Sequence, residues 1–231
     1  MRGGSLSTTV THNYMHWKHK KRLLSDDDDN NKVAGQFPIY INNGPDQPQQ
    51  MSVGIRVVEN AVFFYGDIDD ETSLELNRVL MEVDNKLQHS KTILGEDAFT
   101  PIIHLHICTC GGNLYPAFST VDTIRNLRSK TYTYVEGLVA SAGTLLSSVG
   151  DRRFIGKYSH MLIHQLSSES YGTFAEMEND LQNCSKLMKI LKDFYKQYTK
   201  IPMKKLDELM KKDIYMDAGE CLAYGVVDEI R

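Results

Sequence analysis

The stretch GLVASAGT, residues 137–144, marks a junction between a strand and a helix. Residues 131–135 (TYTYV) precede it, and this β-branched and aromatic run predicts a strand. Residues 144–149 (TLLSSV) follow it and are apolar enough to begin a buried helix. Ser141 is therefore expected at the turn where the strand ends and the helix begins.

Ser141 has two features of a serine nucleophile. Its neighbours Ala140, Ala142 and Gly143 are small, so a substrate can approach the hydroxyl closely. The start of the following helix offers unpaired N–H groups that suit the anionic intermediate of acyl transfer. A serine that only caps the helix gives the same local pattern. The hydrolase motif G-x-S-x-G is not met, because Val139 stands in place of its first glycine.

Strands and helices alternate on both sides of this junction. The patterns predict strands at residues 55–58, 61–65, 102–108, 152–155, 160–165 and 226–228, and helices at residues 71–88, 116–128 and 173–200. The last helix begins with a capping box, Thr173 and Glu176, and its apolar stripe suits packing between subunits as well as within one. The alternation indicates an α/β fold with a largely parallel sheet.

A histidine follows the candidate serine in the chain. His164 is expected at the C-terminal end of the strand at residues 160–165, where functional groups collect in α/β sheets. It fits a general base for Ser141, although a structural role explains a lone histidine as well. Spacing does not choose among the acidic residues that would orient it, which are Asp207, Asp213, Asp217 and Asp228.

Side chains of metal-binding type stand two residues apart at His104, His106, Cys108 and Cys110. In a strand they share one face, but structural zinc needs a tetrahedral cage and not a row. We therefore expect a packed face and no metal site. The pair Gly111-Gly112 that follows allows backbone geometry closed to other residues. It is either a tight turn or a means of aiming a bare N–H at a bound group.

Composition excludes several classes of protein. The net charge of −4 and the isoelectric point near 6.1 argue against a nucleic-acid binder. The 4 cysteines are too scattered for a disulfide framework, and no apolar run reaches the roughly 18 residues of a membrane span. These features predict a cytoplasmic protein without membrane contact. Residues 1–50, with their charge blocks and prolines, are expected to form a flexible arm, and residues 51–231 one folded domain.

Taken in order, these segments resemble the ClpP family, the proteolytic subunits of the Clp protease. The resemblance covers about residues 53–231. Residues 140–143 (ASAG) resemble the family's nucleophile segment, and residues 162–165 (LIHQ) resemble its histidine segment. Residues 212–220 (KDIYMDAGE) resemble its acid segment, and Gly111-Gly112 resembles its glycine pair.

This resemblance implies a serine endopeptidase that hydrolyses unfolded polypeptides. Ser141 would attack the peptide carbonyl, and His164 would carry the proton to the leaving amine. The resemblance selects Asp213 as the acid that orients the imidazole. It assigns the oxyanion to the N–H groups of Gly112 and Ala142.

The resemblance also implies an architecture and an assembly. The family's fold is a crotonase-like spiral of ββα units from which a long handle helix protrudes, here residues 173–200. Its subunits form heptameric rings that stack in pairs as a tetradecamer around a closed chamber. A Clp ATPase unfoldase feeds polypeptide substrates into that chamber. The family needs no cofactor and no metal, and no G-x-x-x-x-G-K-[ST] loop for ATP occurs in this sequence.

The sequence departs from the family at several points, which include a slightly shorter loop between Ser141 and His164 and a longer N-terminal arm. Thr109-Cys110 stands where the family has Ser-Pro, Leu166 replaces a proline, and Lys211-Lys212 replaces an acidic pair. Two alternatives therefore stay open, an inactive or weakly active ring subunit that co-assembles with another ClpP and a specialised maturation protease. Acyl-CoA chemistry, found in the same superfamily, is disfavoured because the serine, histidine and aspartate segments are all matched.

Overall fold

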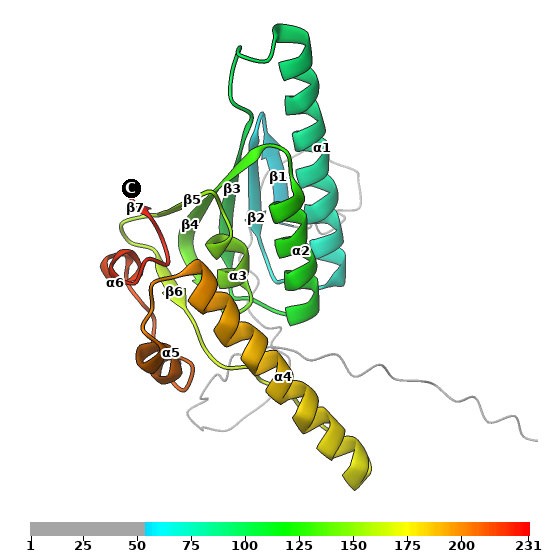
Figure 1. The fold of residues 1–231 in the computed structure, drawn as a ribbon, viewed down its shortest axis with the longest axis vertical. Coiled ribbons are helices and arrows are strands. Elements are labelled where there is room, and N and C mark those ends of the chain that lie inside the picture. Colours follow the sequence, from blue (N-terminus) through cyan, green and yellow to red (C-terminus); the bar gives the residue numbers. More distant parts are fainter. Residues whose placement is uncertain (1–53) are drawn as a thin grey trace, which may run out of the picture.

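A seven-stranded, mostly parallel sheet organises the chain. The computed structural model describes residues 54–231, and the predicted arm, residues 1–50, lies outside them. The elements in chain order are β1 (Ile55–Val58), β2 (Ala61–Tyr65), α1 (Asp70–Leu94), β3 (Ile102–Thr109), α2 (Leu114–Asn126), β4 (Lys130–Ala140), α3 (Gly143–Ser148), β5 (Arg152–Ile155), β6 (His160–Leu162), α4 (Phe174–Tyr198), α5 (Met203–Leu209), α6 (Ala218–Ala223) and β7 (Glu229–Ile230) (Figure 1).

The strands follow the order β1-β2-β3-β4-β5-β7, and β6 also pairs with β4. β1 and β2 form an antiparallel hairpin, whereas the other strand pairings are parallel. Parallel neighbours require a crossover, which α1 supplies between β2 and β3 and α2 supplies between β3 and β4. The α/β class predicted from the alternation of strands and helices is confirmed.

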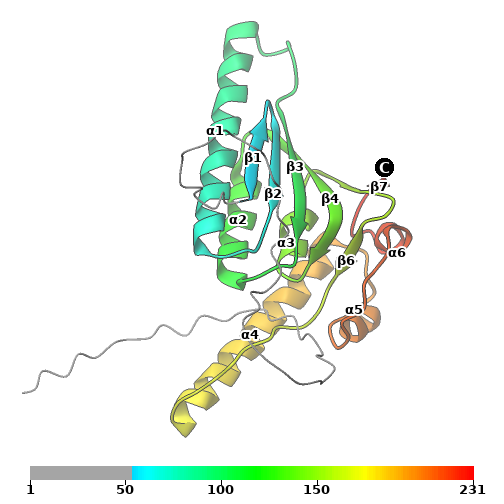
Figure 2. The same cartoon turned by 180° about the vertical axis from the view of Figure 1, so that it is seen from behind.

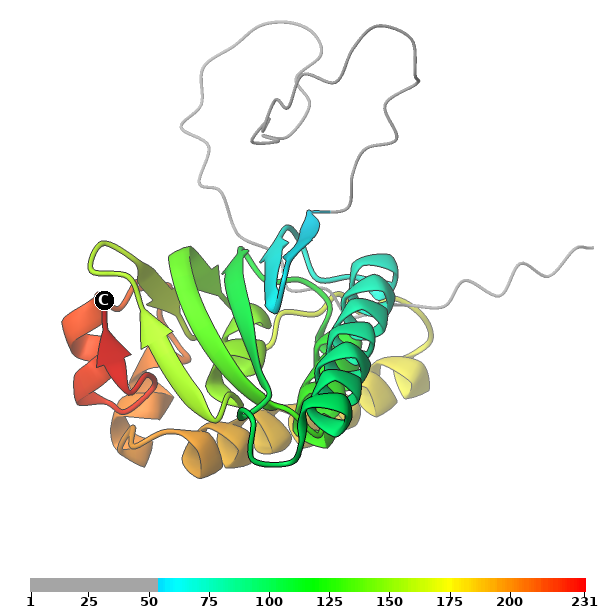
Figure 3. The same cartoon turned by 90° about the horizontal axis from the view of Figure 1, so that it is seen from above.

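One face of the sheet lies against helices and forms the core. Along β3, Ile103, Leu105 and Ile107 are fully buried, whereas His104 and His106 point to the other face and are partly exposed. Helices α1 and α3 pack against β3. Figure 3 shows α1 and α4 on the same side of the sheet. This alternating burial matches the sequence of β3, in which buried apolar residues alternate with partly exposed polar ones.

The opposite face carries histidines among aromatic rings. The ring of His106 stacks between Phe63 and Tyr134, with centroids 4.5 Å from each. Its Nδ1 atom lies 2.6 Å from a carboxylate oxygen of Glu136. The Nδ1 atom of His104 lies 2.7 Å from the hydroxyl of Tyr134. The prediction of a packed face in this part of the sheet is confirmed.

Strand β4 divides its pairing between two neighbours. Residues 132–135 pair with β5, and residues 138–140 pair with β6. Between them the backbone is irregular at Gly137, which has φ 63°. A bulge of this kind bends a strand and re-aims the residues that follow it. The bend brings the end of β4 beside the end of β6, and the candidate site lies there.

The long helix α4 begins at the predicted capping box, in which Thr173 and Glu176 each bond the other's backbone N–H. Its C-terminal half buries Leu191 and Tyr195 in the core. Its N-terminal half extends away from the sheet (Figures 1 and 2), where Leu181 is 69 % exposed. Within residues 54–231, no helix is both long enough and apolar enough to cross a bilayer.

Several predicted boundaries are wrong. The strand predicted at residues 131–135 runs from Lys130 to Ala140, and the helix predicted at residues 116–128 is Leu114–Asn126. β6 ends at Leu162, so His164 lies beyond the strand, because the chain there turns to meet the 210–216 segment. The last strand is Glu229–Ile230 and not residues 226–228, because Val226 donates its N–H to the carbonyl of Cys221 at the end of α6. Helix α1 continues past residue 88 to Leu94, where Gly95 ends it.

Candidate active site

Ser141 occupies a strained turn between β4 and α3. Its φ is 59°, and Glu59 is the only other non-glycine residue with positive φ in residues 54–231. Its N–H donates to the carbonyl of Leu162 at 2.8 Å, and its carbonyl accepts from the N–H of Thr144 at 3.0 Å. The side chain is 3 % exposed, and its Oγ has no hydrogen-bond partner among the described residues. A buried hydroxyl in a strained backbone is a common mark of a functional position.

The turn at Gly111 and Gly112 packs directly against this serine. A Cβ on Gly111, which has φ 99°, would lie 2.5 Å from the Cβ of Ser141. A Cβ on Gly112 would lie 2.1 Å from the carbonyl oxygen of Ile68. The turn is held by two bonds with Ile68, whose N–H donates to Gly111 at 2.9 Å and whose carbonyl accepts from Asn113 at 2.7 Å. Only glycine fits these two positions.

Two backbone N–H groups remain available at this turn. Within residues 54–231, neither the N–H of Gly112 nor that of Ala142 donates a hydrogen bond to another residue. Gly112 lies in the turn that contacts Ser141, and Ala142 follows Ser141 in the chain. Unused donors beside a buried hydroxyl are the groups that an oxyanion requires.

His164 is paired with an acid from a distant segment. Its Nδ1 lies 3.3 Å from Oδ1 of Asp213, and the two side chains are 9 % and 61 % exposed. Met161 and Met216 exchange backbone hydrogen bonds of 2.9 and 2.7 Å, which bring the 213–216 segment beside β6. Gln165 donates its N–H to the carbonyl of Met210 at 2.8 Å, so the histidine is held from both sides.

The other three acidic candidates have different partners. Asp207 forms an ion pair of 2.6 Å with Lys192 of α4. Asp217 caps α6 by accepting from the N–H of Glu220. Asp228 forms an ion pair of 2.6 Å with Arg153. Tertiary structure therefore distinguishes Asp213 from three residues that spacing along the chain could not separate from it, in agreement with the choice that the family resemblance made.

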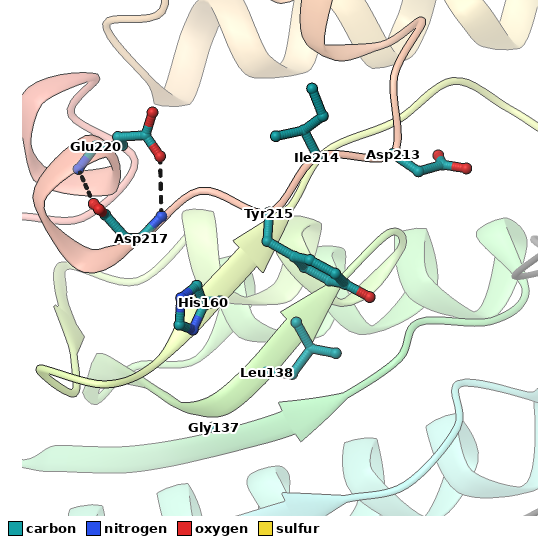
Figure 4. Close-up of a pocket in the computed structure, with 8 residues that line it drawn as sticks. All are labelled: Gly137, Leu138, His160, Asp213, Ile214, Tyr215, Asp217 and Glu220. Atoms are coloured by element: carbon teal, nitrogen blue, oxygen red, sulfur yellow. Dashed lines mark hydrogen bonds between the residues drawn. The ribbon is translucent and has the colours of Figure 1, made fainter.

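A surface hollow of about 720 Å³ opens beside Asp213. Figure 4 shows that its wall is built from β4, β6 and the loop that carries Asp213, with the ring of Tyr215 beside Leu138. The lining residues are Gly137, Leu138, His160, Asp213, Ile214, Tyr215, Asp217 and Glu220. The hollow therefore lies between Asp213 and the bulge of β4 at Gly137, and neither Ser141 nor His164 lines it.

Sequence reasoning missed Thr109, which supports both halves of the turn. Its Oγ1 accepts from the N–H of Gly111 at 3.0 Å, and a Cβ on Gly143 would lie 2.3 Å from its Cγ2. The side chain is 4 % exposed. A threonine at the end of a strand has many ordinary roles, so no local signal in the sequence distinguishes this one.

A known protein family matches the part of the chain that contains this arrangement. The family described as Clp protease matches residues 55–231, which covers every described strand and helix. The chain belongs to the Clp protease family. The match contains Ser141, His164 and Asp213 as well as the glycine turn.

Curated members of the Clp protease family are moderately similar to this chain. The ATP-dependent Clp protease proteolytic subunit 2 of Chlamydia muridarum is 34 % identical over 140 residues, which are 60 % of this chain and 68 % of that protein. The proteolytic subunit of Deinococcus radiodurans is 31 % identical over 130 residues, which are 55 % of this chain and 64 % of that protein. That of Angiopteris evecta is 29 % identical over 175 residues, 74 % of this chain and 83 % of that protein. The matched part therefore spans slightly less than two thirds of the Deinococcus relative.

A solved structure of the family shares the fold. A mutant of ClpP1 from Listeria monocytogenes superimposes with a TM-score of 0.63 at 19 % identity, over 75 % of this chain and 91 % of that chain. The ClpP-like architecture expected from the sequence is confirmed by this match. At this identity the superposition establishes the fold and leaves the chemistry to the residues themselves.

Proposed function

We propose that this chain is the serine endopeptidase subunit of a chambered Clp-type protease. The observation that carries the proposal is that three elements lie at the paired ends of β4 and β6, where Ser141 donates its N–H to the carbonyl of Leu162, two residues before His164. These are the strained serine turn, the glycine turn packed against it, and the His164–Asp213 pair at 3.3 Å. Each element alone has an ordinary structural explanation, but together they match the requirements of acyl transfer.

The reaction follows from the roles of the side chains. The Oγ of Ser141 attacks the peptide carbonyl carbon while Nε2 of His164 takes the hydroxyl proton. The tetrahedral oxyanion receives hydrogen bonds from the N–H groups of Gly112 and Ala142. His164 then gives its proton to the leaving amine, and water hydrolyses the acyl-enzyme by the same proton transfers in reverse order. Asp213 accepts from Nδ1–H and stabilises the imidazolium in both steps.

The assembly is part of the proposal. The N-terminal half of α4 exposes Phe174, Met177 and Leu181 on one stripe, and a soluble monomer rarely leaves such a stripe open. We place this stripe in the contact between two heptameric rings of a tetradecamer. A Clp ATPase unfoldase would supply polypeptide substrates. Cytoplasmic location fits four cysteines that are all free.

The decisive experiment combines covalent labelling with turnover. A fluorophosphonate probe should label Ser141, and the purified assembly should hydrolyse short unstructured fluorogenic peptides with or without a Clp ATPase. Ser141→Ala should abolish labelling and lower kcat by at least about 10³-fold. Ser168→Ala, on an exposed serine of the loop before α4, is the matched control and should change neither. A native ring whose Ser141 stays unlabelled and that cleaves no peptide would refute the proposal.

A further inference from the structure

A chain of hydroxyl groups joins α4 to the carbonyl of Ser141. The hydroxyls of Tyr195 and Thr144 lie 2.6 Å apart, and Oγ1 of Thr144 donates to the Ser141 carbonyl at 2.7 Å. A threonine hydroxyl has one proton. Because Thr144 gives that proton to Ser141, the hydroxyl of Tyr195 must be the donor to Thr144. The direction of the two hydrogen bonds is therefore fixed: Tyr195 of α4 donates to Thr144, and Thr144 donates to the carbonyl of Ser141.

Both hydroxyls are removed from water. Thr144 is 0 % exposed and Tyr195 is 1 % exposed. Burial raises the pKa of the Tyr195 hydroxyl, so the hydroxyl keeps its proton and stays a donor to Thr144. In this environment a missing partner cannot be replaced by solvent. Removal of the tyrosine hydroxyl would leave the threonine hydroxyl with one bond fewer and free to rotate.

The receiving carbonyl belongs to the strained residue itself. Ser141 has φ 59°, a conformation that persists only when surrounding contacts determine it. Its carbonyl accepts both the N–H of Thr144 at 3.0 Å and the Thr144 hydroxyl at 2.7 Å. Thr144 is therefore the residue that holds the turn from the helix side, and Tyr195 holds Thr144.

Tyr195 belongs to the part of α4 that is anchored in the core. Its ring meets the ring of Phe194 edge to face at a centroid distance of 5.6 Å, and Leu191 one turn earlier is fully buried. The same helix extends into the exposed N-terminal half (Figure 1). A rotation or shift of α4 would therefore move the tyrosine hydroxyl relative to Thr144.

We propose that Tyr195 is a positioning residue for Ser141, which acts through Thr144 and ties the geometry of the nucleophile to the placement of α4. The inference rests on the proposed peptidase function for its kinetic consequence, but its structural part stands on the hydrogen bonds alone. Sub-ångström errors in the placement of a nucleophile lower the rate of the chemical step, whereas substrate binding is unaffected.

The kinetic test uses substitutions that remove single hydroxyl groups. Tyr195→Phe should lower kcat for a fluorogenic peptide by about 10-fold and leave KM within about 2-fold. Thr144→Val should have the same effect or a larger one. Thr144→Ser keeps the hydroxyl group and should retain the wild-type kcat. The double variant Tyr195→Phe/Thr144→Val should be no slower than Thr144→Val, because both substitutions interrupt the same series of hydrogen bonds. Tyr198→Phe, one turn further along α4, is the control and should leave kcat unchanged.

A second readout separates this inference from the peptidase proposal. Hydrogen exchange followed by mass spectrometry reports the amides of residues 141–146 whether or not the protein cleaves peptides. Tyr195→Phe should speed exchange there by about 10-fold relative to Tyr198→Phe, because the bonds of the turn open more often. Equal exchange in the two variants would overturn the proposal that Tyr195 positions Ser141 through Thr144. If exchange differs while the wild-type protein neither cleaves peptides nor reacts with the fluorophosphonate probe, the role of Tyr195 in holding the turn is supported and the peptidase proposal fails.

Discussion

The imidazole of His164 lies 3.3 Å from the carboxylate of Asp213, and the two residues belong to segments joined by backbone pairing of Met161 with Met216. The ring is buried, whereas the carboxylate is 61 % exposed. Water therefore competes with the imidazole for hydrogen bonds to the carboxylate. The strength of the Asp213–His164 interaction then depends on how firmly the 213–216 segment is fixed. Two backbone hydrogen bonds fix it, so the acid can be exposed and still be well placed.

Asp213→Asn tests the role of this pair. The amide keeps the shape of the carboxylate but loses the charge that stabilises an imidazolium and selects its tautomer. We expect kcat for peptide hydrolysis to fall by about 10²- to 10⁴-fold with the melting temperature nearly unchanged. Asp207→Asn is the matched control, since Asp207 pairs with Lys192 on the surface and should have little effect on kcat. Equal activity of the two variants would remove Asp213 from the site.

Gly111→Ala tests the close approach of the glycine turn. The added methyl would lie 2.5 Å from the Cβ of Ser141 and 2.8 Å from the carbonyl oxygen of Ala140, at a backbone φ of 99°. We expect fluorophosphonate labelling of Ser141 to be lost and the free energy of unfolding to fall by about 1–3 kcal/mol. Gly66→Ala is the control, because a Cβ there meets no atom within 4 Å. Normal labelling of Gly111→Ala would show that the turn does not touch the nucleophile.

Asp84 should make stability depend on pH in the acid range. Its carboxylate is 5 % exposed, a burial that by itself would raise its pKa. Hydrogen bonds from Ser129 at 2.8 Å and from Arg128 at 3.0 Å outweigh this burial and lower the pKa. Because the folded pKa lies below the unfolded value of about 3.9, the stabilisation is complete above about pH 5 and disappears as the pH falls through the folded pKa.

The measurement is urea unfolding of wild type and Asp84→Asn across this range. At pH 7 we expect the variant to be less stable by about 2 kcal/mol, since a buried charged acceptor is lost. The difference should shrink below about pH 4. A difference that stays constant from pH 7 to pH 3 would show that the carboxylate is not held in its ionised form.

The two halves of α4 should respond differently to truncation. Leu191 is fully buried, so Leu191→Ala should lower the free energy of unfolding by about 2–5 kcal/mol. Leu181 is 69 % exposed, so Leu181→Ala should change the stability of the isolated subunit by less than about 0.5 kcal/mol. If the exposed half forms the contact between rings, Leu181→Glu should split the assembly in native mass spectrometry. An intact assembly in that variant would remove this stripe from the interface.

Local signals in the sequence predicted much of the fold. The strands at Ile55–Val58 and Ala61–Tyr65 and the capping box at Thr173 were found correctly, because each depends on residues close together in the chain. Boundaries failed where a distant segment decides them. His164 lies beyond β6 because the next residue, Gln165, donates its N–H to the carbonyl of Met210 in a distant segment, and no periodicity in residues 160–165 indicates that contact.

The sequence by itself determined the α/β class and the turn that carries Ser141, because small residues and β-branched runs act through local sterics. Spacing left four aspartates open and the family resemblance selected Asp213, but only the tertiary structure shows that its carboxylate lies 3.3 Å from His164. Only the tertiary structure shows that the glycine turn packs against Ser141, that Thr109 supports this turn, and that Tyr195 reaches the serine through Thr144. These contacts join residues far apart in the chain. Their geometry is set by how helices pack on the sheet, and spacing along the sequence does not encode it.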